Sequence, residues 1–269
     1  MAANGWQPKT ATVIGAGSGI GRALALELAG RGFSVAALSR SPGNLSSLRT
    51  EAIKLRTHLQ IFPCDVTDSG DFGRAMQAAG DSAVIVHTAG SALPVGPVWE
   101  CDQDNGIEAL SAMVLSPWLT ARLCLQRLLS AGSGMLLLAS SGAANKSAPG
   151  RSTYSMSKAA VDQLVRVVGA ELRMINADVG IAAFYPGMVD TGMQQQMRQA
   201  AESYRGSPFG AELAPFLQVS EAGSLLSPAV VAGHIAELAM VGPRELNGRI
   251  WRLRDGGWSP LSEHGARYE

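Results

Sequence analysis

A glycine-rich segment near the amino terminus limits the possible folds more than any other part of the chain. In TATVIGAGSGIGRALALELAGRGF, Gly15, Gly19 and Gly21 stand between a β-rich stretch at 10–14 and a run of strong helix formers from Arg22. A strand, a glycine turn and a helix in this order let the backbone approach a pyrophosphate, which also meets the N–H groups and positive dipole end of the helix. The segment predicts a dinucleotide-binding turn, and the alternative is a tight turn that holds no ligand.

The rest of the chain repeats this strand-then-helix pattern. The apolar runs that we predict as strands lack the alternation of half-exposed strands, which indicates a parallel sheet covered on both faces. Pro117 is expected to bend the longest helix. The mixed segment 188–227 interrupts the pattern and is expected to form an irregular substrate lid within a single domain, 1–269. The predicted strands lie at about 10–14, 34–40, 58–66, 82–90, 134–141, 179–187 and 248–257, and the predicted helices at about 22–29, 45–56, 72–79, 107–129, 155–174 and 228–241.

Composition excludes several classes of partner. The 269 residues carry 22 basic and 22 acidic side chains, so no net charge attracts nucleic acid or an anionic membrane. Three scattered cysteines without C-x-x-C spacing fit a reducing compartment, and four scattered histidines show no metal-binding spacing. The sequence has no signal-like segment and no apolar run of membrane length. We therefore expect a cytoplasmic protein that binds neither metal, membrane nor nucleic acid.

The predicted second strand ends in ALSRS, which bears on the choice between NAD(H) and NADP(H). In NAD-type folds an acidic residue at this place hydrogen-bonds the ribose 2′-hydroxyl. Ser39 stands there instead, and Arg40 follows it. An arginine binds a 2′-phosphate through a charge-assisted and often bidentate contact, so the pair favours NADP(H). The alternative is that Arg40 is a solvated loop charge.

Three polar side chains in SSGAANKSAPGRSTYSMSKAA form a candidate catalytic group. Tyr154 stands four residues before Lys158, on one face of the predicted helix, and thirteen residues after Ser141. A carbonyl that accepts hydride needs a proton donor and stabilising dipoles at its oxygen. A nearby ammonium favours the phenolate, so we expect Lys158 to lower the pKa of Tyr154. Taken alone, the pair is more typical of an ordinary helix-surface contact.

Further motifs follow the predicted strands. They are Gly15-x-x-x-Gly19-Ile20-Gly21, Asp65-Val66, Ala89-Gly90, Ser141, Tyr154-x-x-x-Lys158, and Pro186-Gly187 followed by Val189 and Thr191. In combination and in this order, they resemble the motifs of the short-chain dehydrogenases/reductases over about 10–255. The segment PGMVDTGMQQQMR is also similar to sepiapterin and benzil reductases. The resemblance implies a Rossmann-type α/β fold: a doubly wound parallel sheet of about seven strands, with helices on both faces and the dinucleotide at its switch point.

The resemblance also implies an oxidoreductase that transfers a hydride between the nicotinamide of NADP(H) and a carbonyl or secondary alcohol of a small molecule. In it, Tyr154 is the general acid in reduction and the general base in oxidation, Lys158 also bonds the nicotinamide ribose, and Ser141 orients the substrate oxygen. A different class stays open: a dinucleotide-binding sensor or scaffold whose catalysis has decayed. The residues expected to contact the cofactor are Gly15, Ser18, Gly19, Ile20, Gly21, Ser39, Arg40, Asp65, Val66, Ala89, Gly90, Tyr154, Lys158, Pro186, Gly187, Val189 and Thr191.

The expected lid bears on the substrate. Its apolar and aromatic side chains are more often the packing of a lid than the wall of a pocket. Where they do face the pocket, the substrate is apolar or aromatic, and the few charges argue against a highly charged one. The side chains are Met193, Met197, Tyr204, Phe209 and Phe216.

Three positions depart from the family pattern. Thr88 replaces the asparagine after the fourth strand, with a modest effect expected on turn packing. Met113 aligns with an asparagine that supports the lysine through a water, and methionine has no strong donor or acceptor for that relay. Either the relay is absent, or the neighbouring backbone or Ser111 holds the water. Arg252 aligns with a carboxylate that holds the pterin in pterin-reducing relatives, which argues against sepiapterin as the substrate.

The two longest predicted helices, 107–129 and 155–174, bear on the oligomeric state. They match the helices that form the dimer contact in this family. The second is apolar around most of its surface, which is consistent with burial on two sides. The resemblance therefore implies a homodimer or a homotetramer.

Overall fold

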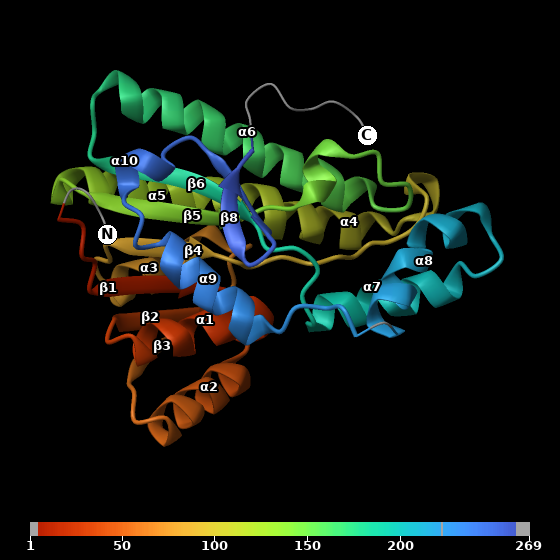
Figure 1. Ribbon diagram of the computed structural model, residues 1–269, viewed down its shortest axis with the longest axis horizontal. Coiled ribbons are helices and arrows are strands. Elements are labelled where there is room, and N and C mark those ends of the chain that lie inside the picture. Colours follow the sequence, from red (N-terminus) through yellow and green to blue (C-terminus); the bar gives the residue numbers. More distant parts are fainter. Residues whose placement is uncertain (1–4, 222, 262–269) are drawn as a thin grey trace.

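Eight strands form one sheet in the part of the chain that the computed structural model describes, residues 5–221 and 223–261. Seven strands are parallel, and the last runs antiparallel to its neighbour. The predicted doubly wound α/β sheet is confirmed, with one short edge strand that the sequence pattern does not reveal (Figure 1). From edge to edge the order is β3 (Leu59–Pro63), β2 (Ser34–Ser39), β1 (Thr10–Ile14), β4 (Val84–His87), β5 (Gly134–Ala139), β6 (Val179–Tyr185), β7 (Ile250–Arg254) and β8 (Gly257–Pro260).

Helices cover both faces of this sheet. Successive residues of a strand point to opposite faces, so Val13 packs into one apolar layer and Ile14 into the other. Strands buried on both faces need apolar side chains at every position, which is why they read as unbroken apolar runs. The first layer contains α1 (Gly19–Gly30), α2 (Pro42–Lys54) and α9 (Pro228–Leu238), and the second contains α3 (Ser69–Ala79), α5 (Ser116–Ala131) and α6 (Ser152–Met174).

The predicted long helix 107–129 is divided into three parts. The helix α4 (Gln103–Leu110) leads into a π-helical turn, η2 (Ser111–Leu115), which continues as α5. Pro117 has no N–H to donate to the carbonyl four residues earlier, which is that of Met113. The bend expected from this proline therefore takes the form of a wider turn just before it, and Met113 lies in that turn.

The segment 188–227 forms a helical cover next to the carboxyl end of β6. The irregular lid expected there consists of two helices, α7 (Gly192–Ser203) and α8 (Pro208–Glu221), which lie side by side beyond the sheet (Figure 1). The sequence conceals α8 because Pro215 lies inside it, and proline normally ends a helix. A small third cluster of buried side chains packs around this pair: Ala92, Met197, Ala201, Leu213 and Phe216.

Three short elements lie outside these layers: η1 (Val98–Glu100), the 3₁₀ turn η3 (Gly142–Asn145) and α10 (Pro243–Leu246). The first two come after β4 and β5, so they stand at the carboxyl ends of the strands, where open α/β sheets bind their ligands. Within residues 5–221 and 223–261, no helix combines the length and the apolarity that a membrane crossing requires.

Candidate active site

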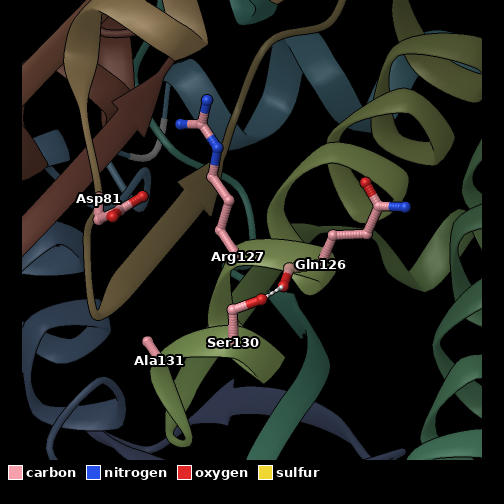
Figure 2. A pocket seen from close by; sticks show the side chains of 5 residues that line it. All are labelled: Asp81, Gln126, Arg127, Ser130 and Ala131. Atoms are coloured by element: carbon pink, nitrogen blue, oxygen red, sulfur yellow. Dashed lines mark hydrogen bonds between the residues drawn. The ribbon is translucent and has the colours of Figure 1, made fainter.

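The two ends of the sheet differ in what they offer a ligand. A cavity of about 350 Å³ lies between α5 and the loop before β4 (Figure 2). This is the amino end of the strands, and none of the predicted site residues lines the cavity. The predicted residues follow β1, β4, β5 and β6, at the carboxyl ends, so the candidate site lies there. The residues around the cavity are Asp81, Gln126, Arg127, Ser130 and Ala131.

The predicted glycine turn joins β1 to α1 and packs tightly against the end of β4. A Cβ on Gly15 would stand 2.6 Å from the Ala89 nitrogen, and one on Gly21 would stand 2.5 Å from the Thr88 hydroxyl oxygen. Contacts this short admit no side chain, so both positions require glycine. Thr88 donates its hydroxyl to the Ile14 carbonyl over 2.9 Å, so this departure from the family pattern still ties β4 to β1.

A further glycine, which the sequence analysis did not single out, brings the same turn to the end of β2. A Cβ on Gly17 would lie only 2.3 Å from the hydroxyl oxygen of Ser39. The turn therefore passes within contact of the residues predicted to choose between the two dinucleotides. The alternating glycines of GAGSG were the available signal for this close approach.

The helix N-termini at this end of the sheet differ from one another in their capping. Ser41 and Asp68 cap α2 and α3 through their side chains, whereas Ser18 before α1 and Thr191 before α7 make no capping hydrogen bond. A Cβ on Gly19 would lie 3.1 Å from the Thr191 methyl group, so the two uncapped ends meet. The first turn of α1 also has no acidic residue. N–H groups not claimed by side chains, together with a glycine-lined turn, fit the pyrophosphate of a dinucleotide.

Arg40 lies at the end of β2, but its guanidinium already has partners. Its Nη1 lies 2.9 Å from the carboxylate of Glu108 on α4 and 3.9 Å from that of Asp65. The hydrogen bond to Glu108 raises the pKa of Arg40. The Arg40 side chain is 69% exposed, so these ion pairs are weak and readily exchanged. The sequence analysis missed Glu108 because it comes from a helix 68 residues away in the chain.

Ser141, Tyr154 and Lys158 come together at the carboxyl end of β5. The Ser141 hydroxyl accepts a hydrogen bond from the Ala143 N–H over 3.2 Å at the start of η3. Tyr154 and Lys158 lie in the first two turns of α6, with the ammonium 5.6 Å from the centre of the phenol ring. Lys158 is buried and donates to the Ala139 carbonyl over 2.9 Å. The structure thus gathers all three residues predicted to be catalytic.

Burial sets the protonation of this group. It raises the pKa of Tyr154, and the Ser141 hydroxyl and the Arg151 charge only oppose that rise. It lowers the pKa of Lys158 to about 8, against the charge of Asp162. The predicted lowering of the Tyr154 pKa is therefore not the net result in this structure, because desolvation outweighs the nearby charges and the Lys158 ammonium donates to a backbone carbonyl. At neutral pH Tyr154 is a neutral phenol.

A buried polar network behind Lys158 was not predicted. Asp162, one turn later on α6, is 1% exposed and accepts hydrogen bonds from the Ser140 hydroxyl, over 2.6 Å, and from the Tyr185 hydroxyl. Asn145 in turn donates to the Tyr185 hydroxyl over 2.9 Å. The network joins β6, η3 and the end of β5 to α6, so it fixes the helix that carries Lys158 against Ser140, the residue that directly follows β5. An aspartate within an apolar stretch of helix was the available signal.

Met113 lies beside Lys158, as its alignment with the family asparagine requires. It is 1% exposed, and a Cβ on Gly90 would stand 3.4 Å from the Met113 Cγ and 4.0 Å from the Lys158 Nζ. Met113 and Lys158 thus approach the same glycine, and the match of Met113 with the family asparagine stays a prediction. The buried imidazole of His87 contacts two hydroxyl groups of α5, each at 3.1 Å, and burial together with the Lys158 charge lowers its pKa to about 3. His87 is thus neutral at neutral pH.

The remaining residues predicted to contact the cofactor also lie along the carboxyl ends of the strands. Asp65 accepts hydrogen bonds from the Thr67 N–H and hydroxyl over 2.9 and 2.7 Å, which closes the loop after β3. Val189 forms a short parallel bridge with Leu226, which holds the segment after β6 in place. Their contacts with the cofactor stay predictions, as do those of Ile20, Val66, Ala89, Gly90, Pro186 and Gly187.

Comparison with known sequences identifies the family to which this site belongs. The family model described as short chain dehydrogenase matches residues 9–202. The chain therefore belongs to the short-chain dehydrogenase/reductase family, whose members are oxidoreductases that bind a nicotinamide cofactor and act on carbonyl or alcohol substrates. The resemblance predicted from the motifs is confirmed.

Three similar proteins cover most of the chain. It is 28% identical over 249 residues to the benzil reductase ((S)-benzoin forming) of Bacillus subtilis (strain 168), which covers 90% of this chain and 97% of that one. It is 27% identical over 187 residues to the NADPH-dependent pterin aldehyde reductase of Arabidopsis thaliana, covering 68% and 76%. The crystal structure of the KRED1-Pglu enzyme has a TM-score of 0.79 and 28% identity, covering 90% and 99%.

Proposed function

We propose that the chain is an NADP(H)-dependent oxidoreductase that interconverts a carbonyl and a secondary alcohol on a small, apolar or aromatic substrate. The observation that carries this proposal is the meeting of Ser141, Tyr154 and Lys158 at the end of β5: a neutral phenol beside a buried amine whose pKa is about 8. A protein that only binds a dinucleotide has no use for a proton donor at that place.

The three residues divide the work of reduction among them. A bound reduced nicotinamide supplies the hydride. Tyr154 gives its proton to the substrate oxygen, because burial keeps the phenol neutral. Ser141 donates a hydrogen bond to the same oxygen and orients it. Lys158, in its protonated form, stabilises the phenolate that proton transfer leaves on Tyr154.

The preference for NADP(H) is proposed from the surroundings of the ribose site. Ser39 brings no carboxylate to repel a 2′-phosphate, and Arg40 is exposed enough to exchange Glu108 for that phosphate. Glu108 and Asp65 oppose the preference, because their charges lie within 4 Å of the same guanidinium. The Arabidopsis relative, which is named as NADPH-dependent, supports it.

The apolar or aromatic character of the substrate is proposed from the lid. Phe216 packs into the third buried cluster, as expected for lid packing. Phe209, however, meets Trp99 of η1 and Tyr204 edge to face, with ring centres 6.2 and 6.1 Å apart. Trp99 is 76% exposed, so this aromatic group is not ordinary core. Benzil, which the Bacillus relative is named for reducing, is an aromatic ketone.

The loss of NADPH absorbance in the presence of aromatic ketones and diketones tests the proposal. We expect turnover with NADPH, and a value of kcat/KM with NADH that is roughly ten- to a hundredfold lower. Tight binding of NADPH without turnover of any carbonyl would instead support a dinucleotide-binding sensor or scaffold. The buried thioether of Met113 beside Lys158 is the one observation that favours that alternative.

We also propose a homodimer or homotetramer. The helices named by the family resemblance expose several large apolar side chains, and five of these are between 45% and 55% exposed. Light scattering at micromolar concentration should show a dimer or tetramer, and Trp118→Glu should shift it toward the monomer. A monomeric wild-type protein would contradict the proposal. The side chains are Ile107, Leu115, Trp118, Met156 and Val167.

A reducing compartment such as the cytoplasm is proposed from the cysteines. Cys64, Cys101 and Cys124 are all free thiols. Burial raises the pKa of Cys64 and of Cys124 to about 12 in each case, so neither is a reactive thiolate at neutral pH. Labelling of a tagged protein in its native cell tests the compartment, and a secreted protein would contradict it.

A further inference from the structure

Two arginines at the catalytic end of the sheet have no hydrogen-bond acceptor in the part of the chain that the structure describes. Arg151 directly precedes α6, and Arg252 lies on β7. Neither guanidinium makes a hydrogen bond or an ion pair with residues 5–221 or 223–261. The arginines whose guanidinium groups do form ion pairs with carboxylates are Arg22, Arg31, Arg40, Arg74, Arg205 and Arg244.

Arg151 is half-buried and lies close to the proposed proton donor. Its guanidinium is placed over the ring of Phe216 on α8, 5.0 Å from the ring centre. Burial raises the pKa of Tyr154, and the charge of Arg151 is near enough to oppose that rise. Glu212 adds a negative charge nearby but does not reach ion-pair distance. Stacking on an aromatic face restrains the guanidinium plane and leaves its N–H edges available to an acceptor.

Arg252 brings a second guanidinium to the neighbourhood of Ser141. It stands opposite Tyr185 in the register of β6 and β7, near the carboxyl ends of both strands. Its Nη2 lies 3.4 Å from the place where a Cβ on Gly142 would stand, and Gly142 directly follows Ser141. A positive charge therefore lies beside the backbone of the residue that follows Ser141.

No described residue supplies an acceptor to the Arg151 guanidinium, and its N–H groups are not enclosed, so a ligand beside Tyr154 can reach them. Building on the proposed function, we propose that Arg151 is a specificity-determining residue that binds a second oxygen of the substrate, beside the carbonyl that Tyr154 protonates. Arg252 adds a second positive charge near Gly142, the residue after Ser141. Guanidinium groups prefer carboxylate or strongly polarised carbonyl oxygens. The substrate class is then a vicinal diketone or a 2-oxo acid that carries an apolar or aromatic group.

Three probes that share a phenyl group distinguish a second carbonyl oxygen from a carboxylate: acetophenone has neither, 1-phenyl-1,2-propanedione has the carbonyl, and phenylglyoxylate has the carboxylate. Each is assayed with NADPH. The readout is the ratio of kcat/KM for each dioxygenated probe to that for acetophenone, which cancels general damage to catalysis. Arg151→Met should lower this ratio by roughly ten- to a hundredfold, as expected for the loss of a charge-assisted hydrogen bond. Arg151→Lys keeps a charge without the planar fork, so it should retain part of the preference for phenylglyoxylate.

Arg205→Met is the matched control. Arg205 lies just after α7 in the same lid, and its guanidinium pairs with Glu202 at 2.6 Å on the exposed surface. Its substitution should leave the ratio unchanged. If the kcat/KM ratio falls only for phenylglyoxylate, Arg151 recognises the negative charge of the carboxylate. If the ratio for the diketone falls as well, Arg151 recognises a second carbonyl oxygen. Both results support the proposal.

An Arg151→Met variant that keeps the wild-type ratio while binding NADPH normally overturns the proposal and leaves the proposed reductase intact. Failure of the wild type to turn over any probe counts against the proposed function instead. Binding then decides the role of Arg151: phenylglyoxylate should raise the Tm of the NADPH complex of the wild type and not that of Arg151→Met. Equal shifts in the two proteins, or no shift in the wild type, would contradict the role.

Discussion

Arg40 directly follows β2 and Arg151 directly precedes α6, so both lie toward the carboxyl ends of the strands, in opposite settings that we call the outer and the inner end of the site. At the outer end, the Arg40 side chain is 69% exposed and reaches two carboxylates, those of Glu108 and Asp65. At the inner end, Arg151 is half-buried, stacks on an aromatic ring and has no acceptor among the described residues. Tyr154 belongs to the same inner end, where burial raises its pKa.

The difference shows how the setting of a charge decides what it does. An exposed ion pair is worth little and exchanges easily, so the outer end is suited to sorting cofactors by modest differences in affinity. A partly buried charge is screened less by water, so the inner end is suited to the proton transfer and orientation proposed for it. Substitutions at the inner end should therefore change rates, and those at the outer end should change cofactor affinity.

The largest effect is expected from Tyr154→Phe at the inner end. The variant keeps the ring and removes the acid, so kcat should fall by at least about a hundredfold, the range typical of general acid–base groups. The Kd for NADPH should stay close to that of the wild type. Steady-state kinetics and a fluorescence titration measure the two quantities. A variant that keeps most of its activity would place the proton donor elsewhere.

At the outer end, Arg40→Ala should weaken NADPH roughly ten- to a hundredfold and leave NADH nearly unchanged, because only NADPH loses a charge-assisted contact. Glu108→Gln is the opposite test. It removes a competitor for the Arg40 guanidinium, which lies 2.9 Å away, so NADPH should bind more tightly. Equal losses for both cofactors in Arg40→Ala would show that this arginine does not read the phosphate.

The pH dependence of the reduction rate should follow the titration of the buried Lys158 amine at the inner end. Lys158 has a pKa lowered by burial to about 8, so it carries its charge below that pH and loses it above. Tyr154 stays protonated in this range because burial raises its pKa. The value of kcat/KM should thus be level near neutrality and fall about tenfold per pH unit above about 8. In the control variant Lys158→Arg, the guanidinium does not lose its proton in this pH range. If kcat/KM of this variant still falls above about pH 8, the deprotonation of Lys158 does not cause the fall.

The smallest effect is expected from Met113→Asn. Pro117 has no N–H to donate to the Met113 carbonyl, and we expect a backbone carbonyl of the wide turn η2 to hold a relay water near Lys158. Restoring the family amide should therefore change kcat by less than about twofold, because the relay is already rebuilt. Met113→Leu, which keeps the apolar volume, is the control. A several-fold gain confined to the asparagine variant, together with a buffer-dependent wild type, would show that the relay is missing.

What the sequence predicted well depends on short stretches of chain. The glycine turn is a local backbone feature, so the positions of Gly15 and Gly21 predict a shape that the structure contains. The pair of Tyr154 and Lys158 was predictable because four residues separate them on one helix. The order of strands and helices followed from unbroken apolar runs.

What the sequence did not predict depends on residues that folding brings together. Arg40 forms an ion pair with Glu108, which is 68 residues away in the chain. The Arg151 guanidinium stacks on the ring of Phe216, which belongs to α8 in the lid. The pKa of Tyr154 was predicted in the wrong direction because burial, which no motif records, outweighs the nearby ammonium. The helix α8 was hidden by an internal proline. These features come from tertiary packing, which single-sequence patterns carry only weakly.

Transfer of deuterium from labelled NADPH tests the central claim most directly. The two C4-deuterated stereoisomers of NADPH are each incubated with the protein and 1-phenyl-1,2-propanedione, and the product is analysed by mass spectrometry. The account predicts a hydroxyketone that carries a single deuterium on the new carbinol carbon from one of the two isomers, and almost no product with Tyr154→Phe. A product that contains no deuterium from either isomer, or binding of NADPH without any product from a panel of carbonyls, would contradict it.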